Sequence, residues 1–502
     1  MRRARIRLPL PLLLALLVAA AAAAGAQDEA SGALAARGKQ LMTAGRYAEA
    51  VPVYRELVAA LPGNPGLLLN LGMALQLSGA SREAVKPLAA AFRLEPGSFP
   101  AALFLGTARL RSGHTRAAIA PLQQAVRLRP DHREARALLV DALVAEGRHA
   151  QAEPQLVALA RLAPEDAAVW FSLGKTYEAL ATQAFGTLVA RDPESAFALA
   201  LVADVRRDEG NATSALDLYR KASARAPGMR GLHAAIAALE REAGRPAEAA
   251  AEDEKERRLK APDCARTPLE CRFAEGKHRE VVRAASGSKT LAAAYWLARS
   301  SNELAGEAFR KLEALPPSAP LHEWRAGLLR DEGRFADSAE EWRKAMARAP
   351  HDTRLRQELA LTLRLDQDLA GAQAVLEQAL REQPDSAMAS YLLGDVMLAR
   401  QQPEAAIPHL EASVRLDPGL AHAQGALGRA LALVGRPAEA VPHLEQALSV
   451  DEDGSLRLQL ARAYRAAGRG ADAERALAEW ERFRKARPDA AAPPASPRVT
   501  PP

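Results

Sequence analysis

Prolines and glycines recur along this chain with a period of 34 residues, and this period restricts the folds open to it. The prolines that show it are Pro62, Pro96, Pro130 and Pro164, and later Pro350, Pro384 and Pro418. Glycines mark a second turn at the same spacing, at Gly45, Gly79, Gly113 and Gly147. Glycine can end a helix in the left-handed conformation, and proline cannot continue one. Each unit is therefore predicted to be a helix, a glycine turn, a second helix and a proline turn.

Small residues stand where the two helices of a unit would cross. An alanine follows each of those glycines by five residues, at Ala50, Ala84, Ala118 and Ala152. A larger side chain fills the next turn, at Tyr54, Leu88, Leu122 and Leu156. One helical pair cannot bury its apolar face alone, so neighbouring units should stack into an all-α solenoid. A composition that is 49% hydrophobic but only 4% aromatic also suits helices.

The pattern resembles the tetratricopeptide repeat, whose signature places Trp, Leu-Gly, Tyr, Ala, Phe, Ala and Pro at fixed offsets. Its first half is matched by Trp170, Leu173, Gly174 and Tyr177. The resemblance covers about residues 31 to 487 and implies a right-handed superhelical solenoid of tandem helix-turn-helix repeats. It also implies a scaffold or adaptor without a cofactor, which binds other proteins or peptide segments in a concave groove lined by the first helix of each unit.

The repeats fall into blocks that the irregular positions separate. We expect about four repeats over 31–166, a degenerate central block over 167–318, about five repeats over 319–487, and a disordered Pro/Ala-rich tail over 488–502. Two units of the central block are shortened, and they end at Pro193 and Pro317. The first has no glycine or proline between Lys175 and Phe185. We predict that each shortened unit runs as one long helix; a tightened turn is the alternative.

The N-terminus has the features of a secretory signal peptide. Arginines precede an apolar run from Leu8 to Ala24, and small residues follow up to Ala26. A permanent membrane anchor is the alternative, but the run is shorter than the ~20 residues needed to span a bilayer and contains two prolines. We therefore expect a signal peptide over 1–26, cleavage after Ala26, a periplasmic or secreted protein, and no stable membrane span afterwards.

Charge and motifs exclude several classes of function. The net charge is +6, but four arginines of the predicted signal peptide supply most of it. The mature chain is nearly balanced and has no general electrostatic reason to bind nucleic acid. No zinc-protease, P-loop, nucleophile-elbow or dinucleotide motif occurs. The sequence therefore predicts no enzyme, no catalytic residues, no cofactor and no metal.

The only two cysteines, Cys264 and Cys271, lie seven residues apart after a highly charged helix. In an exported chain, a disulfide that closes a small loop is expected. Free buried thiols are the alternative. A metal site is disfavoured because no pair of histidines lies nearby, and the spacing is not that of a redox motif.

In the later units, the resemblance places nine residues on the groove: Arg354, Gln357, Arg364, Tyr391, Asp395, His422, Arg429, Arg462 and Arg465. Arginine offers a planar fork for carboxylates and the tyrosine ring offers a stacking face, so the expected ligand is an acidic peptide segment or an exposed C-terminus. Alternatively, these arginines pair with Asp395 and neighbouring carboxylates and only solvate the groove. The earlier groove is less polar, with Leu69, Met73, Leu103 and Leu110 proposed inward, and could hold an apolar segment.

Two other functions stay open beside the scaffold. One is an accessory component of a cell-envelope assembly, such as a system for polysaccharide export or biosynthesis. The other is a glycosyltransferase-associated protein, since such repeats are also found fused to catalytic domains. The second has little room here, because repeats occupy nearly all of residues 31–487.

Overall fold

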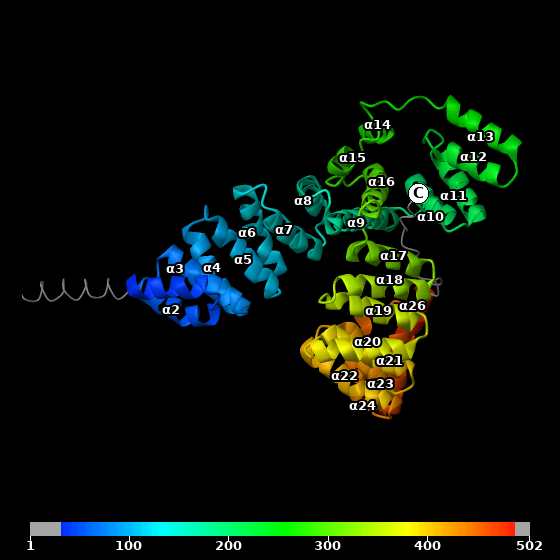
Figure 1. The fold of residues 1–502 in the computed structure, drawn as a ribbon. Helices are drawn as coiled ribbons and strands as arrows, with labels where there is room; N and C mark the ends of the chain where they lie inside the picture. Colours follow the sequence, from blue (N-terminus) through cyan, green and yellow to red (C-terminus); the bar gives the residue numbers. More distant parts are fainter. Residues whose placement is uncertain (1–31, 487–502) are drawn as a thin grey trace, which may run out of the picture. The chain divides into compact units, whose positions relative to one another are not determined.

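The computed structural model describes residues 32–486, and within this range the regular secondary structure is entirely helical. The predicted signal peptide over 1–26 and the predicted tail over 488–502 lie outside the described residues. The helices follow one another as pairs joined by short turns (Figure 1). This confirms the predicted all-α solenoid of helix-turn-helix repeats.

The described chain divides into two compact units. The first unit contains residues 32–191 and 261–305, and the second contains 192–260 and 306–486. The first unit begins with four helical pairs, formed by a helix over 32–43 with α2 (Tyr47–Ala60), α3 (Pro65–Leu77) with α4 (Ser81–Leu94), α5 (Phe99–Arg111) with α6 (Thr115–Leu128), and α7 (Arg133–Ala145) with α8 (His149–Leu162). Its remaining helices are α9 (Ala167–Arg191), α14 (Pro268–Ala274), α15 (His278–Ala285) and the first part of α16 (Leu291–Glu313).

The second unit contains two pairs before residue 260 and five after residue 318. The earlier pairs are α10 (Ala196–Asp208) with α11 (Ala212–Arg225) and α12 (Leu232–Glu242) with α13 (Pro246–Arg258). The later pairs are α17 (Ala319–Asp331) with α18 (Phe335–Arg348), α19 (Thr353–Leu365) with α20 (Leu369–Glu382), α21 (Ala387–Ala399) with α22 (Pro403–Leu416), α23 (Ala421–Leu433) with α24 (Pro437–Gln446), and α25 (Ser455–Ala466) with α26 (Gly470–Ala486). A short 3₁₀ helix, η1 (Ala447–Val450), follows α24.

The two shortened units each form one uninterrupted helix, as predicted. Helix α9 runs for 25 residues through the place where a turn would stand, and α16 runs for 23 residues. Leu180, Ala181, Ala184 and Leu188 are buried in this second half of α9. Their spacing of three to four residues is that of one face of an α-helix. With no turn residue to end it, the helix continues along that face.

The predicted glycine turns take the backbone conformation that requires glycine. Gly45, Gly79, Gly113 and Gly147 have φ values from 66° to 91°. Two later turns use Gln367 and Gln401 at φ of 63° and 60° in the same conformation. The glycine period therefore did not mark those two turns, although the helices around them are regular.

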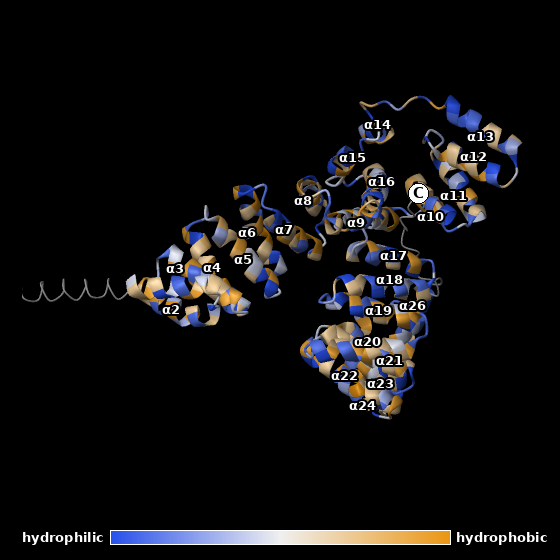
Figure 2. Cartoon of the chain, in the orientation of Figure 1, coloured by the Kyte–Doolittle hydropathy of each residue, from blue (hydrophilic) through white to orange (hydrophobic). Residues whose placement is uncertain are grey.

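The core of each pair depends on a close approach between its two helices. Gly72, Gly106, Gly394 and Gly428 of the first helices face Leu88, Leu122, Leu410 and Leu444 of the second. A Cβ atom added at Gly106 would lie 2.4 Å from the Cγ of Leu122, a side chain with no exposed surface. Hydrophobic and hydrophilic residues both occur along most helices, whereas α13 is mostly hydrophilic (Figure 2). The absent side chain at each glycine is thus what lets the leucine fill the crossing.

Successive first helices also lie against one another. In the second unit α19 contacts α21, and α21 contacts α23; in the first unit α3 contacts α5, and α5 contacts α7. The second helices pack chiefly on their own first helix and on the next one along the chain. Side chains of neighbouring first helices are therefore brought together on one side of each stack. Among the described residues, none of the helices is both long and apolar enough to cross a membrane.

Candidate partner-binding face

The nine predicted groove residues all lie on first helices of consecutive pairs. Arg354, Gln357 and Arg364 are on α19, Tyr391 and Asp395 on α21, His422 and Arg429 on α23, and Arg462 and Arg465 on α25. We call these nine residues the arginine face. The structure brings some of them into direct contact and leaves others apart.

Asp395 lies at the centre of the arginine face and joins three helices. Arg429 Nη2 donates a hydrogen bond to Asp395 Oδ1 at 2.9 Å, and Arg364 Nε lies 2.8 Å from Oδ2. The Nε–H of Arg364 is not directed at that oxygen, so this second contact is an ion pair without a hydrogen bond. The Asp395 side chain is only 9% exposed. These two arginines are therefore held by a carboxylate of the chain itself.

Tyr391 lies beside this cluster on the same helix. Burial raises the pKa of the Tyr391 hydroxyl above its ordinary value, and the charge of Asp395 raises it further. Its ring centroid is 6.2 Å from that of His422, which is exposed. The tyrosine thus keeps its proton at neutral pH.

Arg354 is also neutralised, by carboxylates that the sequence did not single out. Its two Nη atoms donate to Glu323 Oε1 and Oε2 of α17, both at 2.6 Å, and Asp352 Oδ2 lies 3.3 Å away. The hydrogen bond to Glu323 raises the pKa of Arg354. A second pair, Arg330 to Glu358 at 2.7 Å, joins the same two helices. Ion pairs thus connect α17 to α19, and α19 to α23 through α21.

Arg462 and Arg465 differ from the other three arginines. Both are exposed, and neither forms an ion pair with any residue in 32–486. Gln357 is half-buried and has no side-chain hydrogen bond within that range. Two exposed apolar side chains on the same helices were missed, Met388 at 41% and Leu433 at 69% exposure. The repeat period would have predicted that both positions face the same way as residues of α19. Met388 stands one period of 34 residues after Arg354, and Leu433 stands two periods, 68 residues, after Leu365.

The apolar positions proposed for the earlier groove are buried or half-buried. Leu103 is part of a core cluster with Ile119 and Leu122, and Leu69, Met73 and Leu110 are half-buried. Only part of each of these side chains is open to a ligand.

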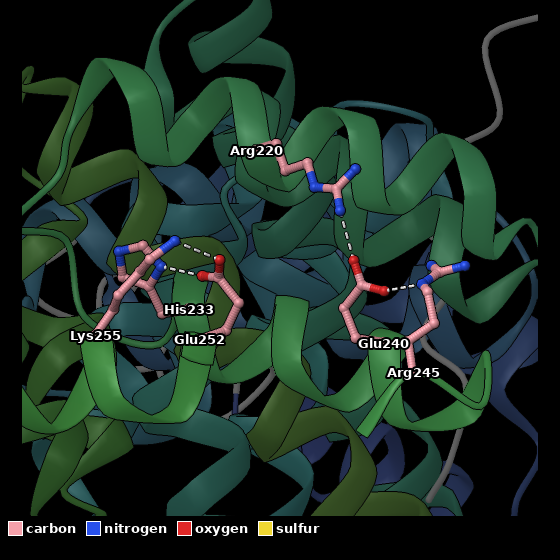
Figure 3. A network of polar contacts seen from close by, with 6 residues as sticks. All are labelled: Arg220, His233, Glu240, Arg245, Glu252 and Lys255. Carbon is pink, nitrogen blue, oxygen red and sulfur yellow. Dashed lines mark hydrogen bonds and ion pairs between the residues drawn. The ribbon is translucent and has the colours of Figure 1, made fainter. Parts of the chain in front are cut away.

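A second set of charged residues lies on α11, α12 and the turn before α13, and none of them belongs to the arginine face. Figure 3 shows Glu240 of α12 between Arg220 of α11 and Arg245 of the turn before α13. Arg220 Nη2 donates to Glu240 Oε1 at 2.5 Å, and Arg245 Nε donates to Oε2. The carboxylate is 1% exposed, whereas its arginines reach solvent. This arrangement is structural, since no side of the carboxylate is left open.

The other network in Figure 3 is repeated later in the chain. His233 Nδ1 is 2.6 Å from Glu252 Oε2, and Lys255 donates to Glu252 Oε1 at 2.6 Å. The same spacing recurs as His322, Glu341 and Lys344, with a distance of 2.7 Å between histidine and glutamate. Each set joins the first and second helix of one pair, in the same register of the repeat. Within residues 32–486, no group of three histidine, cysteine or acidic side chains could hold a metal ion.

These two glutamates should make the stability depend on pH. Burial would raise the pKa of Glu252, but hydrogen bonds from Lys255 and His233 outweigh it and lower the pKa, and Glu341 behaves in the same way. A carboxyl group with a lowered folded pKa stabilises the fold above its unfolded pKa, and this stability is lost as pH falls through the folded value. We expect the urea midpoint to drop between about pH 5 and pH 3, and to drop less in the Glu252→Gln, Glu341→Gln variant. The exposed control Glu242→Gln should follow the parent profile; identical profiles for all three proteins would contradict the assignment.

The two cysteines are joined by a disulfide, with an S–S distance of 2.04 Å. Cys271 lies in α14 and is buried, and Cys264 is exposed in the segment before it. The bond joins the second half of the segment between α13 and α14 to α14 itself. It ties a segment without regular structure to the first turn of a short helix.

The stacked helical pairs define an α-helical repeat protein. Family models described as tetratricopeptide repeat match residues 13–65, 41–103, 109–174, 358–421 and 423–458, which together make up about half of the chain. The chain belongs to the tetratricopeptide repeat family.

Several solved structures are similar to this chain. A crystal structure of MamA is 22% identical, covering 39% of this chain and 92% of that chain with a TM-score of 0.29. Yeast Tom70 is 14% identical, with coverages of 83% and 91% and a TM-score of 0.30. The APC/C hetero-tetramer Cut9-Hcn1 is 13% identical, with coverages of 80% and 96% and a TM-score of 0.24. No curated protein matches the chain.

Proposed function

We propose that this protein is a scaffold or adaptor that holds an acidic segment of a partner protein along the arginine face. The observation that carries the proposal is that two arginines of this face, Arg462 and Arg465, are exposed and form no ion pair with any residue in 32–486. Glu323 and Asp395 neutralise three of the arginines, and Arg462 and Arg465 remain for a ligand. The C-terminal end of the face, on α25, is thus where carboxylates of a partner would bind.

The chemistry of these side chains suits binding and orientation. A guanidinium group stays protonated at neutral pH and presents several donors in one plane, which matches a carboxylate. The exposed side chains of Met388 and Leu433 would accept apolar residues of the same segment. The pairs around Asp395 and Glu323 hold neighbouring first helices in register, so the face is ordered before the partner arrives.

Photo-crosslinking tests this placement directly. With His422→p-benzoylphenylalanine on the arginine face and Arg415→p-benzoylphenylalanine on the second helix α22, we expect partner adducts from position 422 only. Arg462→Ala with Arg465→Ala should weaken adduct formation at least tenfold. The matched control is Arg343→Ala with Arg381→Ala, two exposed arginines of second helices without ion pairs among residues 32–486. Equal adducts at positions 422 and 415, or none, would contradict the proposal.

We also propose that the chain is exported to the periplasm or beyond. The support is the N-terminal sequence, with its arginines, apolar run and small residues, together with the cysteine pair, which would be oxidised outside the cytoplasm. Sequencing of the protein from cell fractions is the test. We expect an N-terminus at Gln27, an envelope or extracellular fraction, and no free thiol. A protein that keeps Met1 and stays in the cytoplasm would overturn the proposal.

A further inference from the structure

The second helices of the early repeats carry an excess of positive charge. Residues 81–128, which run from α4 to α6, contain seven arginines and lysines but only two glutamates. One of these, Glu83, is already held by Arg55 of α2 at 2.5 Å. Helix α6 has no acidic residue, whereas α22, a second helix of the second unit, has Glu404 and Glu411. The helices α4 and α6 therefore lack most of the carboxylates that balance the charge elsewhere.

The helical register turns these cations away from the core. On α4, Lys86 and Arg93 stand four and eleven residues after Arg82, which places all three within about 40° around the helix axis. The buried residues of the same helix, among them Leu88 and Ala91, lie on the opposite side. One repeat later α6 has arginines at two of these positions, and α8 has one at the last of them. We call the six residues the basic outer face: Arg82, Lys86, Arg93, Arg116, Arg127 and Arg161.

The cations of the basic outer face have no counter-ions within the described chain. All six side chains are exposed, and none forms an ion pair with any residue in 32–486. Other exposed arginines pair with an acid one turn away, as Arg257 does with Glu254 and Arg436 with Glu439. Unpaired charges of one sign on one side of a protein attract an anionic partner.

Exposed leucines accompany the arginines of this face. A leucine directly follows the last arginine of α4, α6 and α8, and it is 49%, 37% and 38% exposed in turn: Leu94, Leu128 and Leu162. Guanidinium groups beside apolar side chains suit the surface of an anionic bilayer, where phosphates lie next to the acyl chains. An acidic protein segment needs donors at fixed positions. Six exposed side chains with no partner to fix them are better matched to the mobile phosphates of lipids.

From this charge and register we infer that the first unit docks on an anionic lipid bilayer through its basic outer face. The five arginines and the lysine contact headgroup phosphates, and the three leucines reach the boundary of the acyl chains. This docking goes beyond the proposed function, because it uses second helices of the other unit and binds lipid instead of a protein segment.

Co-sedimentation with lipid vesicles tests the docking. The protein used is residues 27–502, which contain the whole described structure but not the arginines and apolar run of the predicted signal peptide, since these would bind lipid themselves. We expect binding to vesicles of phosphatidylglycerol and phosphatidylcholine in equal parts, little binding to phosphatidylcholine alone, and weaker binding as salt rises. No binding to the anionic vesicles, or equal binding to both kinds, would overturn the inference.

Three substitutions assign the binding to the basic outer face. Arg82→Gln, Arg116→Gln and Arg127→Gln together should weaken binding to the anionic vesicles about a hundredfold, since each basic residue near such a surface contributes about fivefold. Glutamine forms helices nearly as well as arginine, and the replaced side chains are exposed, so the fold should be kept.

A matched control removes the same charge from the second unit. Arg343→Gln, Arg381→Gln and Arg415→Gln replace exposed arginines of second helices that have no ion pair within 32–486. This variant should bind the anionic vesicles within about threefold of the parent protein, because its arginines do not face the lipid. An equal loss in both triple variants would mean a general effect of charge and would contradict the assignment.

An environment-sensitive dye tests the leucines without relying on a loss of binding. Leu128→Cys labelled with nitrobenzoxadiazole should brighten on anionic vesicles, because the dye enters the acyl boundary. The control is Leu416→Cys, which has the same position at the end of α22 and replaces a leucine that is 41% exposed. Unchanged emission at position 128, or equal changes at both positions, would count against the docking.

A soluble polyanion separates a membrane from an acidic protein segment. Polyglutamate that bound the parent protein as tightly as the vesicles do would make this face a site for protein, and the lipid inference would be wrong. Arg462→Ala with Arg465→Ala should bind the vesicles as the parent does. Failure of the acidic-segment proposal is therefore distinguishable from failure of this one.

Discussion

Replacing Arg220 and Arg245 together with alanine is expected to lower the free energy of local unfolding of α11 to α13 by about 3–5 kcal/mol. Both arginines contact the Glu240 carboxylate, which is 1% exposed (Figure 3). Their removal leaves that charge buried without a cation, which costs far more than the loss of a surface ion pair. Hydrogen exchange of the α12 amides measures the effect, because it reports local opening in a repeat protein whose unfolding need not be two-state.

We expect the loss of stability in the double arginine variant to come from the Glu240 carboxylate, which stays buried and charged. Adding Glu240→Gln to the double arginine variant removes that charge and is expected to restore most of the lost protection. Glu240→Gln alone should reduce the protection of the α12 amides less than the double arginine variant does. Both arginine side chains are more than 40% exposed and can be solvated by water when the carboxylate is absent. If the triple variant were as unstable as the double one, the loss would reflect arginine packing instead of the buried charge.

Gly106→Ala is expected to destabilise its repeat by about 2–3 kcal/mol, even though alanine is the better helix former by about 1 kcal/mol. The new Cβ would lie 2.4 Å from the Cγ of Leu122, and Leu122 is fully buried at the crossing of α5 and α6. The helices must move apart or the leucine must leave its rotamer, and either change exceeds the gain in propensity. Hydrogen exchange of the α5 and α6 amides in the parent and the variant gives the difference.

Gly186 supplies a matched control for this prediction. It also lies within a helix, α9, but a Cβ added there meets nothing within 4 Å. Gly186→Ala should therefore stabilise the protein by up to about 1 kcal/mol, the opposite sign. Two substitutions of the same chemistry then differ only in the space around them. A destabilisation of equal size at both positions would contradict the packing argument.

Local signals accounted for most of the fold. The proline and glycine period placed the helix ends because these residues act on their own backbone, and the missing turn before Phe185 placed the long helix α9. The two turns at Gln367 and Gln401 were harder to see, since glutamine has no intrinsic preference for positive φ. The packing of the helices around them holds the backbone there.

The candidate site was predicted less completely than the fold. Residue type and register placed all nine side chains of the arginine face on first helices, and they also suggested the alternative that arginines pair with Asp395. The sequence did not identify Glu323 as the partner of Arg354, nor the exposed Leu433. Both depend on which side chains of neighbouring repeats meet, and a period alone does not say that.

The sequence by itself determined that this protein is a stack of helical pairs, where most of its turns fall, and which helices carry the arginines. These features follow from residues acting within one repeat. Only the tertiary structure decided that Asp395 is neutralised by two arginines of neighbouring first helices. It also decided that Arg354 is held by a glutamate, while Arg462 and Arg465 form no ion pair within the described residues. The reason is that an ion pair between repeats needs two side chains, distant in sequence, brought within a few ångströms of each other by the packing of neighbouring helices.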